Sequence, residues 1–230
     1  IFFPKMSRNY AAGETKENFR LLCSLLTTIS MVILPILLFF TLFAQDIVRV
    51  VYERGAFTSQ DTIMVGMVLS AYSVGMLGLS WQEILNKFYY SSHDSKTPMI
   101  ISFVGILINV VCSLALMRKL GVTGIAVAST ISVTFIALVL FVLVRRQGQG
   151  ESIKPFLLDM GKVLFSTVIC GGVLLAGNML IGGFTGGIVV AVCKMAVVFF
   201  VACLAYGGAL FALDAGQARD MVKLIKKKGS

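Results

Sequence analysis

The sequence predicts an all-α polytopic membrane protein with six transmembrane helices, and three observations lead to this fold class. Hydrophobic residues make up 57% of the 230 residues and charged residues only 13%, against roughly 25% charged in an ordinary soluble domain. The mean hydropathy is +0.91. The uncharged runs cover residues 21–45, 62–82, 97–117, 120–144, 163–193 and 195–213. About 20 apolar residues span a bilayer core as a helix, which excludes a soluble enzyme, a disulfide-rich secreted domain and a disordered chain.

The longest uncharged run is expected to divide into two helices, because Ile181-Gly-Gly-Phe-Thr-Gly-Gly187 is typical of a tight turn. The six expected spans are 21–45, 62–86, 98–117, 121–144, 163–181 and 188–213. The first four, within residues 21–144, form one group, and the last two form a C-terminal pair within 163–213. Three polar segments complete the organisation: a loop at 1–20, a connection at 145–162 and a basic tail at 214–230.

The first span contains Pro35 near its middle, where a proline removes one backbone hydrogen bond. This residue either bends the helix beside a cavity or is simply tolerated in lipid. Beyond the span, Asp46, Arg49 and Glu53 have the i,i+3 and i,i+4 spacing of ion pairs on one helical face. We therefore expect an interfacial helical extension on the outer side, and we expect Gly55 to end it in a left-handed conformation.

Two later spans begin with capping signals. Thr58 or Ser59 can cap the start of the second span by accepting a hydrogen bond from its first turn, where Asp61 is favourably placed. At the third span, Thr97 is the expected N-cap and Pro98 the first helical residue.

The fourth span carries small residues one turn apart, at Gly124, Ala128 and Ser132. Small residues at this spacing let helices approach closely in lipid. We expect this face to remain exposed within the chain, as a surface for a partner helix.

The positive charges predict the orientation of the spans, because cytoplasmic loops carry an excess of Lys and Arg. Four basic residues lie on one side: Arg49, Arg54, Arg118 and Lys119. Fifteen lie on the other side: Lys5, Arg8, Lys16, Arg20, Lys87, Lys96, Arg145, Arg146, Lys154, Lys162, Arg219, Lys223, Lys226, Lys227 and Lys228. The larger group is expected to be cytoplasmic, which places both ends of the chain there. The net charge of +9 therefore reflects membrane orientation, and no nucleic-acid-binding motif accompanies it.

Three segments between the spans resemble the MviN/MurJ family of the MOP transporter superfamily, the lipid II flippases. The first begins with Pro4-Lys-Met-Ser7. The second is Tyr52-Glu-Arg54-Gly55-Ala56-Phe57-Thr58, and the third runs from Phe88 through Asp94 to Thr97-Pro98. We identify Arg54, Gly55, Phe57, Asp94, Thr97 and Pro98 as structural motif residues. The resemblance covers residues 1–145 well, whereas residues 146–230 match by hydropathy alone.

The resemblance implies a fold of fourteen transmembrane helices in two lobes, with two extra helices at the C-terminus. In that frame this chain is the C-terminal part of the transporter, and we expect that earlier helices of the same protein are missing. The implied partner, besides membrane lipid, is an undecaprenyl-pyrophosphate-linked peptidoglycan precursor. It is moved from the inner to the outer leaflet of the bacterial inner membrane. The arginine-lined central cavity of the family lies outside this chain.

Few residues inside the spans can carry chemistry. Lys194 is the one charged residue well inside a span; it either snorkels to the outer interface or faces a cavity and contacts an anionic head group. Asn109 and Ser113 on the third span, with Ser129 on the fourth, form either a polar contact between helices or a cation site. No Asp or Glu lies deep in a span, so we predict no enzyme, no cofactor and no metal centre.

Other functions remain open at this point. Within the superfamily, the alternatives are a flippase for polysaccharide repeat units and a multidrug exporter of the MATE type. A membrane scaffold without transport activity is an alternative of another class. Arginine-rich helices upstream of this chain would distinguish a flippase from a drug exporter.

Overall fold

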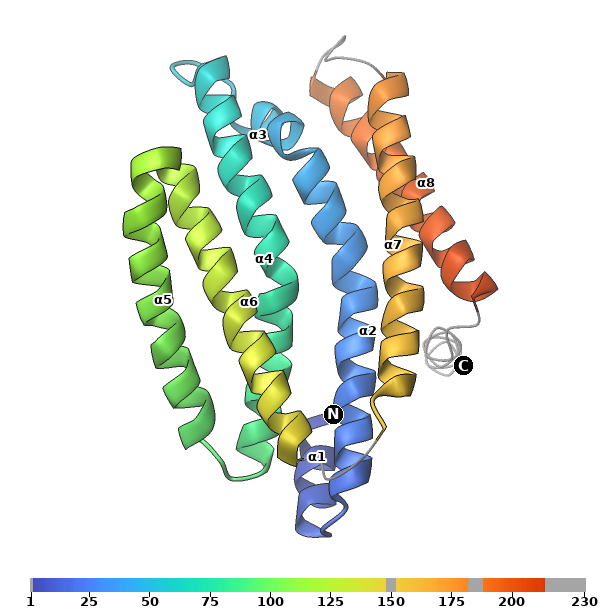
Figure 1. Cartoon of the computed structure of the whole chain (residues 1–230). Coiled ribbons are helices and arrows are strands. Elements are labelled where there is room, and N and C mark those ends of the chain that lie inside the picture. Colours follow the sequence, from blue (N-terminus) through green and yellow to red (C-terminus); the bar gives the residue numbers. More distant parts are fainter. Residues whose placement is uncertain (1, 148–151, 182–187, 214–230) are drawn as a thin grey trace.

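The apolar runs form long helices that lie side by side (Figure 1). The computed structural model describes residues 2–147, 152–181 and 188–213, and it contains no strand within these ranges. The helices are α1 (Phe2–Ala11), α2 (Thr15–Leu42), α3 (Ala44–Tyr52), α4 (Ser59–Ser91), α5 (Lys96–Leu120), α6 (Val122–Gln147), α7 (Lys154–Ile181) and α8 (Ile188–Ala212). The predicted basic tail at 214–230 lies outside the described residues, and so does the predicted glycine-rich turn after its first residue, Ile181.

Six of the described helices are long and apolar enough to cross a membrane, namely α2 and α4 to α8. This confirms the predicted spans. The surface of α5 supports a bilayer environment, because Val111 is 66% exposed and Leu114 is 65% exposed. Apolar side chains exposed along a whole helix are favourable in lipid and costly in water.

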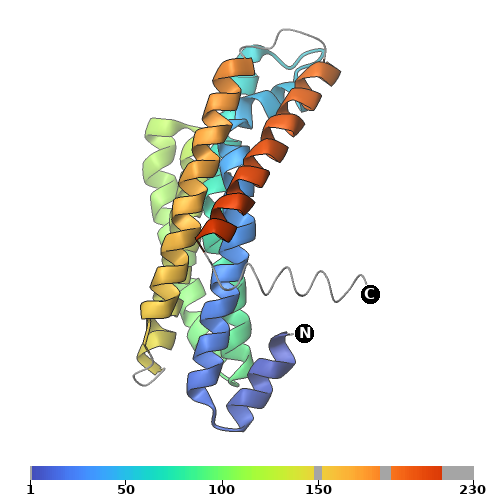
Figure 2. The same cartoon turned by 90° about the vertical axis from the view of Figure 1, so that its right-hand side faces the viewer.

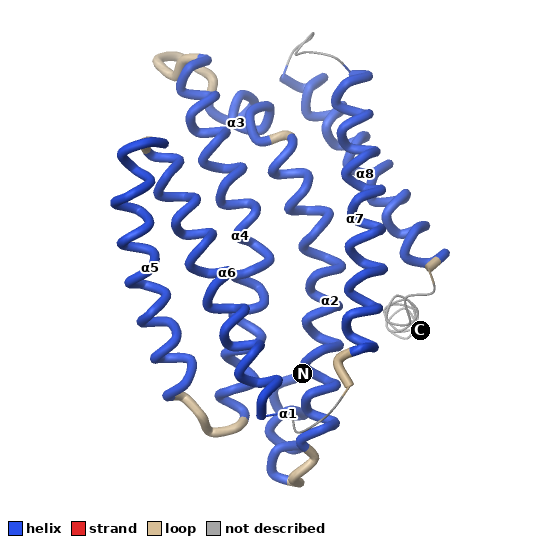
Figure 3. Tube along the Cα trace, in the orientation of Figure 1, coloured by secondary structure: helices blue, strands red, loops and turns tan. Residues whose placement is uncertain are grey.

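The helices form two groups. The first, which we name the core bundle, consists of α2, α4, α5 and α6, with α4 packed between α2 and α6 and with α5 packed on α6. The second is the C-terminal pair, α7 and α8, in which α7 also packs on α2. In the view of Figure 3 the pair stands on the opposite side of α2 from α5 and α6.

Two hydrophobic clusters hold these groups together. One joins the core bundle to the start of α7 and includes Leu26, Leu85, Leu140 and Phe156. The other joins α2 to the C-terminal pair through residues such as Leu34, Cys170, Leu174 and Tyr206. Burying a leucine side chain contributes about 1.5–3 kcal/mol where water is the alternative, but between helices in lipid the gain comes from close packing.

The structure differs from the predicted boundaries at several points. The segment before α2 contains a short helix, α1, and the outer extension is a separate helix, α3, because α2 ends before Phe43. Helix α7 begins at Lys154, inside the predicted polar connection. The reason is Phe156, which is 6% exposed and packs its ring against Trp81 at a centroid distance of 6.1 Å.

Two further expectations were wrong. Ser95, rather than Thr97, is the N-cap of α5, and Pro98 is the third residue of that helix. The small-residue face of α6 is covered within the chain, because Ala128 is 0% exposed and Ser132 is 4% exposed. A Cβ atom on Gly124 would lie 2.6 Å from the carbonyl carbon of Leu116. This face therefore allows the close approach of α5 and α6 and leaves no free surface for another helix.

Candidate functional site

A row of polar side chains joins α5 and α6 inside the predicted membrane region, and we name it the polar seam (Asn109, Ser113, Ser129 and Ser132). Asn109 Nδ2 donates a hydrogen bond to Ser129 Oγ at 3.0 Å, and Ser113 Oγ donates to Asn109 Oδ1 at 3.4 Å. Ser132 Oγ donates to the backbone oxygen of Gly105 at 2.6 Å. The structure thus brings the three residues of the predicted polar site together, with one hydrogen bond between the helices and one within α5.

Another side of α6 contacts α4. Thr130 Oγ1 donates to the backbone oxygen of Ala71 at 2.7 Å, which is possible because Gly75 has no side chain at this crossing. A Cβ on Gly75 would lie 2.8 Å from Thr130 Oγ1. Hydroxyl groups on α6 are therefore bonded to both neighbouring helices, and they fix the relative position of all three.

The first motif turn, residues 53–62, is built around Glu53. Its carboxylate pairs with Arg49 Nε at 3.2 Å and accepts hydrogen bonds from Ser59 Oγ at 3.0 Å and Thr62 Oγ1 at 2.8 Å. These bonds, that from Thr62 above all, hold the pKa of Glu53 below its usual value.

The start of α4 confirms the predicted cap. The Thr58 side chain accepts from the backbone N–H of Asp61, and the Asp61 carboxylate accepts from the backbone N–H of Thr58 at 2.8 Å. Gly55 has a φ of +61°, in the left-handed region that was expected. Tyr52 and Phe57 place their rings 6.0 Å apart across this turn.

The second motif turn joins α4 to α5 at the opposite end of the bundle. Asp94 accepts hydrogen bonds from the backbone N–H of Lys96 at 3.1 Å, the backbone N–H of Thr97 at 3.0 Å and the hydroxyl of Thr97 at 2.6 Å. The Thr97 side chain is the main cause of a lowered pKa at Asp94. His93 takes a positive φ of 57°, which aims the chain into α5. Both motif segments therefore act as turn and cap structures.

Lys194 lies apart from the polar seam. It is half-buried on α8, which packs mainly on α7, whereas the seam lies between α5 and α6. Neither predicted role of Lys194 is tested by this arrangement. In the described ranges, no three His, Cys, Asp or Glu side chains meet as a metal site would require.

Two cavities bring together polar residues that the sequence did not single out as sites. A cavity of about 550 Å³ at the end of the bundle that carries α3 is lined by Thr41, Gln45, Asp46, Ser70, Thr123 and Asn178, among others. Of the two ion pairs predicted on this helical face, the one between Arg49 and Glu53 is confirmed at 3.2 Å. A second cavity, of about 620 Å³, lies beside α1. In the sequence, this cavity is indicated by the spacing of Lys5, Arg8 and Asn9, which lie one helical turn apart.

Comparison with known proteins gives the family. The model of the lipid II flippase MurJ family matches residues 1–199. This chain belongs to the MurJ family of lipid II flippases. The match extends past residue 145, so the family pattern includes α7 and part of α8 and the resemblance there is more than hydropathy.

Related MurJ proteins agree with this assignment. A probable lipid II flippase MurJ of Rhizobium tropici is 28% identical over 174 residues, which is 76% of this chain and 33% of the relative. One from Buchnera aphidicola is 27% identical over 222 residues, or 93% of this chain and 41% of the relative. A solved structure of lipid II flippase MurJ in an inward closed conformation has a TM-score of 0.68 at 22% identity, and it shares the fold across 90% of this chain. The chain spans 33% to 42% of the length of these three proteins.

Proposed function

We propose that this chain takes part in moving a lipid-linked peptidoglycan precursor from the inner to the outer leaflet of the bacterial inner membrane. The observation that carries the proposal is the MurJ family match over residues 1–199. The six membrane-spanning helices and the fold shared with a MurJ structure support it further. The substrate and direction come from the family, because the chain spans less than half of its relatives.

The proposed mechanism is alternating access, in which two helix bundles rock about a site near the middle of the membrane. The core bundle supplies a rigid unit for such a motion, since hydrogen bonds link α6 to both α4 and α5. A diphosphate head group needs several cations or hydrogen-bond donors to offset its desolvation. We therefore propose that the remaining helices of a full-length flippase complete the central site.

A chimera tests this function directly. The matching segment of the Rhizobium tropici flippase is replaced by this chain, and the chimera is expressed in cells whose own flippase can be depleted. We expect the chimera to sustain growth and the 230-residue chain alone to insert into the membrane without sustaining it. A chimera that inserts but exports a cationic drug, with no rescue, would favour the MATE alternative. Rescue by the isolated chain would contradict the two-bundle mechanism.

The proposed orientation places α1 and the α4–α5 turn in the cytoplasm, and it rests on the distribution of Lys and Arg. Cysteine is introduced at Ala56 or at Ser95, which are exposed in opposite turns, after the five native cysteines are replaced. An impermeant thiol reagent added to intact cells should label Ala56→Cys and should label Ser95→Cys only after the membrane is opened. The reverse pattern would invert the topology.

A further inference from the structure

The cavity at the end of the bundle that carries α3 is lined by residues of both the core bundle and the C-terminal pair. It has a volume of about 550 Å³, and its lining comes from α2, α3, α4, α6 and α7. Figure 2 shows the last turn of α7 at the same end of the molecule as α3. The volume falls within the roughly 300–1,000 Å³ that small-molecule sites occupy.

The polar side chains of this lining are not used within the chain. They are Thr41, Gln45, Asp46, Ser70, Thr123 and Asn178. None of the six has a side-chain hydrogen bond or ion pair to another described residue, in contrast to the polar seam, whose side chains bond one another. The hydroxyl oxygen of Thr41 is itself buried, so the other five are the groups that a ligand in the cavity can reach.

Asp46 sets the charge of the cavity. It is half-buried, and among the described residues the lining contains no Lys, Arg or His to balance it. Arg49, one helical turn further along α3, pairs instead with Glu53 at 3.2 Å. A ligand with an ammonium group would therefore supply a charge-assisted hydrogen bond to the carboxylate. A ligand that carries negative charge alone, such as a diphosphate, is disfavoured by the same lining.

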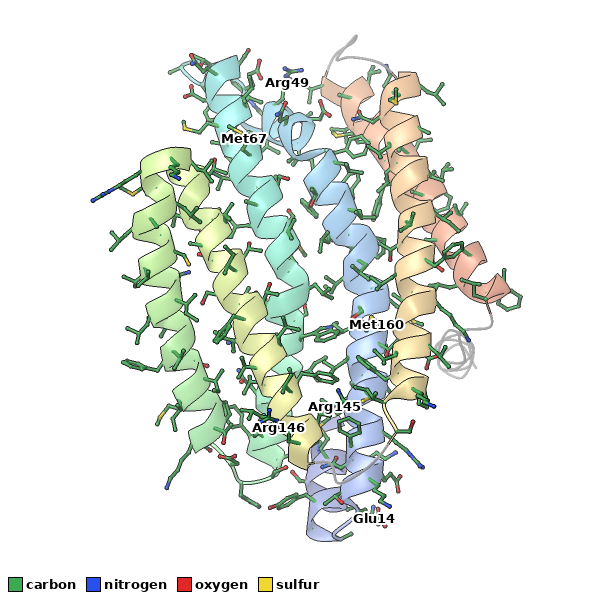
Figure 4. The ribbon with its side chains drawn as sticks, in the orientation of Figure 1. Glu14, Arg49, Met67, Arg145, Arg146 and Met160 are labelled. Atoms are coloured by element: carbon green, nitrogen blue, oxygen red, sulfur yellow. The ribbon has the colours of Figure 1, made fainter. Side chains whose placement is uncertain are left out.

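The cavity lies at the level where membrane-spanning helices begin or end. Thr41 is next to the last residue of α2, Thr123 follows the first residue of α6, and Asn178 is in the last turn of α7. Figure 4 shows Met67 of α4, another lining residue, at the same end of the bundle as Arg49 of α3. Because spanning helices end near the polar head groups of a bilayer, lipid head groups are the polar molecules most concentrated at this depth.

The lining is also partly apolar. Leu42, Met67 and Val74 contribute to it, and the side chains of Met67 and Val74 are 46% and 49% exposed. An acyl chain can lie along such a surface while the polar groups bind a head group. A hydrated metal ion would leave the apolar part of the lining without a contact.

We propose that this cavity binds the zwitterionic head group of an amine-bearing membrane lipid, of which phosphatidylethanolamine is the type. The Asp46 carboxylate binds the ammonium group, and the side-chain amides of Gln45 and Asn178 donate to the phosphate oxygens. Such a lipid is distinct from the transported precursor of the proposed function. It joins the end of α7 to the core bundle, since the two amides belong to α3 and α7.

Lipid retention by the full chain in detergent, counted by native mass spectrometry, tests the ammonium contact. Phosphatidylethanolamine and phosphatidylcholine with the same acyl chains are added in equal amounts; both are zwitterions, but the choline nitrogen has no N–H to donate to a carboxylate. We expect wild type to prefer phosphatidylethanolamine roughly tenfold, and Asp46→Asn to lose this preference. Asp159→Asn is the matched control, because it removes a half-buried carboxylate of α7 that lies outside this cavity, and it should keep the preference.

Asn178→Leu tests the phosphate contact separately. Because both lipids carry the same phosphate, this variant should retain less of each while the preference for phosphatidylethanolamine remains. A general loss of structure would not divide the two effects between the two variants in this way. Melting of the helical signal should be unchanged in both.

Equal retention of the two lipids by wild type, an unchanged preference in Asp46→Asn, or an equal loss in Asp159→Asn would overturn the proposal. The same measurement on the chimera with the Rhizobium tropici flippase tests whether the cavity stays open in a longer protein. We expect the preference to persist there, and its disappearance would assign the cavity to another helix and overturn the lipid site. The chimera can sustain growth with or without the preference, so this proposal and the proposed function fail separately.

Discussion

The core bundle and the C-terminal pair are both made of apolar helices, yet they are held together differently. In the core bundle, small residues bring backbones together and hydroxyl or amide groups bond across the gap, as at Gly105 with Ser132 and at Ala71 with Thr130. In the pair, α7 and α8 pack through aliphatic and aromatic side chains such as Leu174, Val198 and Tyr206. Hydrogen bonds between helices fix position more sharply than apolar packing in lipid does.

This difference indicates which part of the molecule moves as a unit. A bundle with closely packed backbones and several directional bonds is expected to keep its shape when helices move, because these contacts would have to break together. The pair joins the bundle mainly through the contact of α7 with α2. Both motif turns also belong to the bundle, since one precedes α4 and the other precedes α5.

The largest expected effect concerns backbone contact within the bundle. A side chain at Gly124 would meet the backbone of Leu116, with the new Cβ 2.6 Å from the carbonyl oxygen, so Gly124→Val must separate α5 from α6. We expect a loss of about 1–3 kcal/mol, the usual cost of overpacking, measured by unfolding in detergent. Gly172→Val on α7 is the matched control, because nothing lies within 4 Å of that position. Equal losses in both variants would contradict the proposed contrast.

A smaller effect is expected at the turn between α4 and α5, and it depends on pH. Asp94→Asn weakens the bonds to the start of α5 and should cost about 1 kcal/mol at neutral pH. The folded pKa of Asp94 lies below its usual value, so its stabilisation is present above the unfolded pKa. It is lost as the pH falls through the folded pKa.

Unfolding measured from neutral to acid pH checks this sign. The wild type and Asp94→Asn should converge in acid, and a difference that grows as the pH falls would contradict the account. In the pair, the side chain of Ser152 bonds the N–H of Lys154 at 3.4 Å. Ser152→Ala should reduce stability less than Asp94→Asn does, and this reduction should not depend on pH.

The helix boundaries and caps show what the sequence can and cannot predict. The six spans were predictable because bilayer thickness demands a certain length of apolar helix, and the Thr58 cap was predictable from local chemistry. The start of α7 was not, because Phe156 packs against Trp81, a residue distant in sequence. Likewise, Gly124 and Ala128 indicated close packing, but the pattern does not say which helix supplies the other surface.

The hydrogen bonds of the polar seam should contribute less to the free energy of unfolding than the backbone contacts around them. Asn109→Leu removes the bonds to Ser129 and Ser113, and bonds between membrane helices contribute about 0.6 kcal/mol on average. We expect a loss near that size in detergent unfolding. Ser166→Ala on α7 is the comparison, because its hydroxyl bonds within its own helix, to the oxygen of Lys162, and its removal should be close to neutral. Sodium-dependent stability that disappears in Asn109→Leu would instead favour the cation-site prediction.

The smallest effect on stability is expected at Lys194, the half-buried cation of α8. Lys194→Leu removes a charge from an apolar helix, so insertion of the chain into membranes should be unchanged or slightly improved. Its effect on transport separates the two predicted roles, because a lysine that snorkels to the interface can be replaced by leucine without loss. A lysine that contacts an anionic head group cannot be replaced by leucine without loss of transport. Lys194→Leu is therefore measured in the rescue chimera, with Lys194→Arg to test whether positive charge suffices. Reduced growth with leucine and recovery with arginine would give the pair a part in substrate handling, whereas normal growth with leucine would make Lys194 a feature of the lipid-facing surface alone.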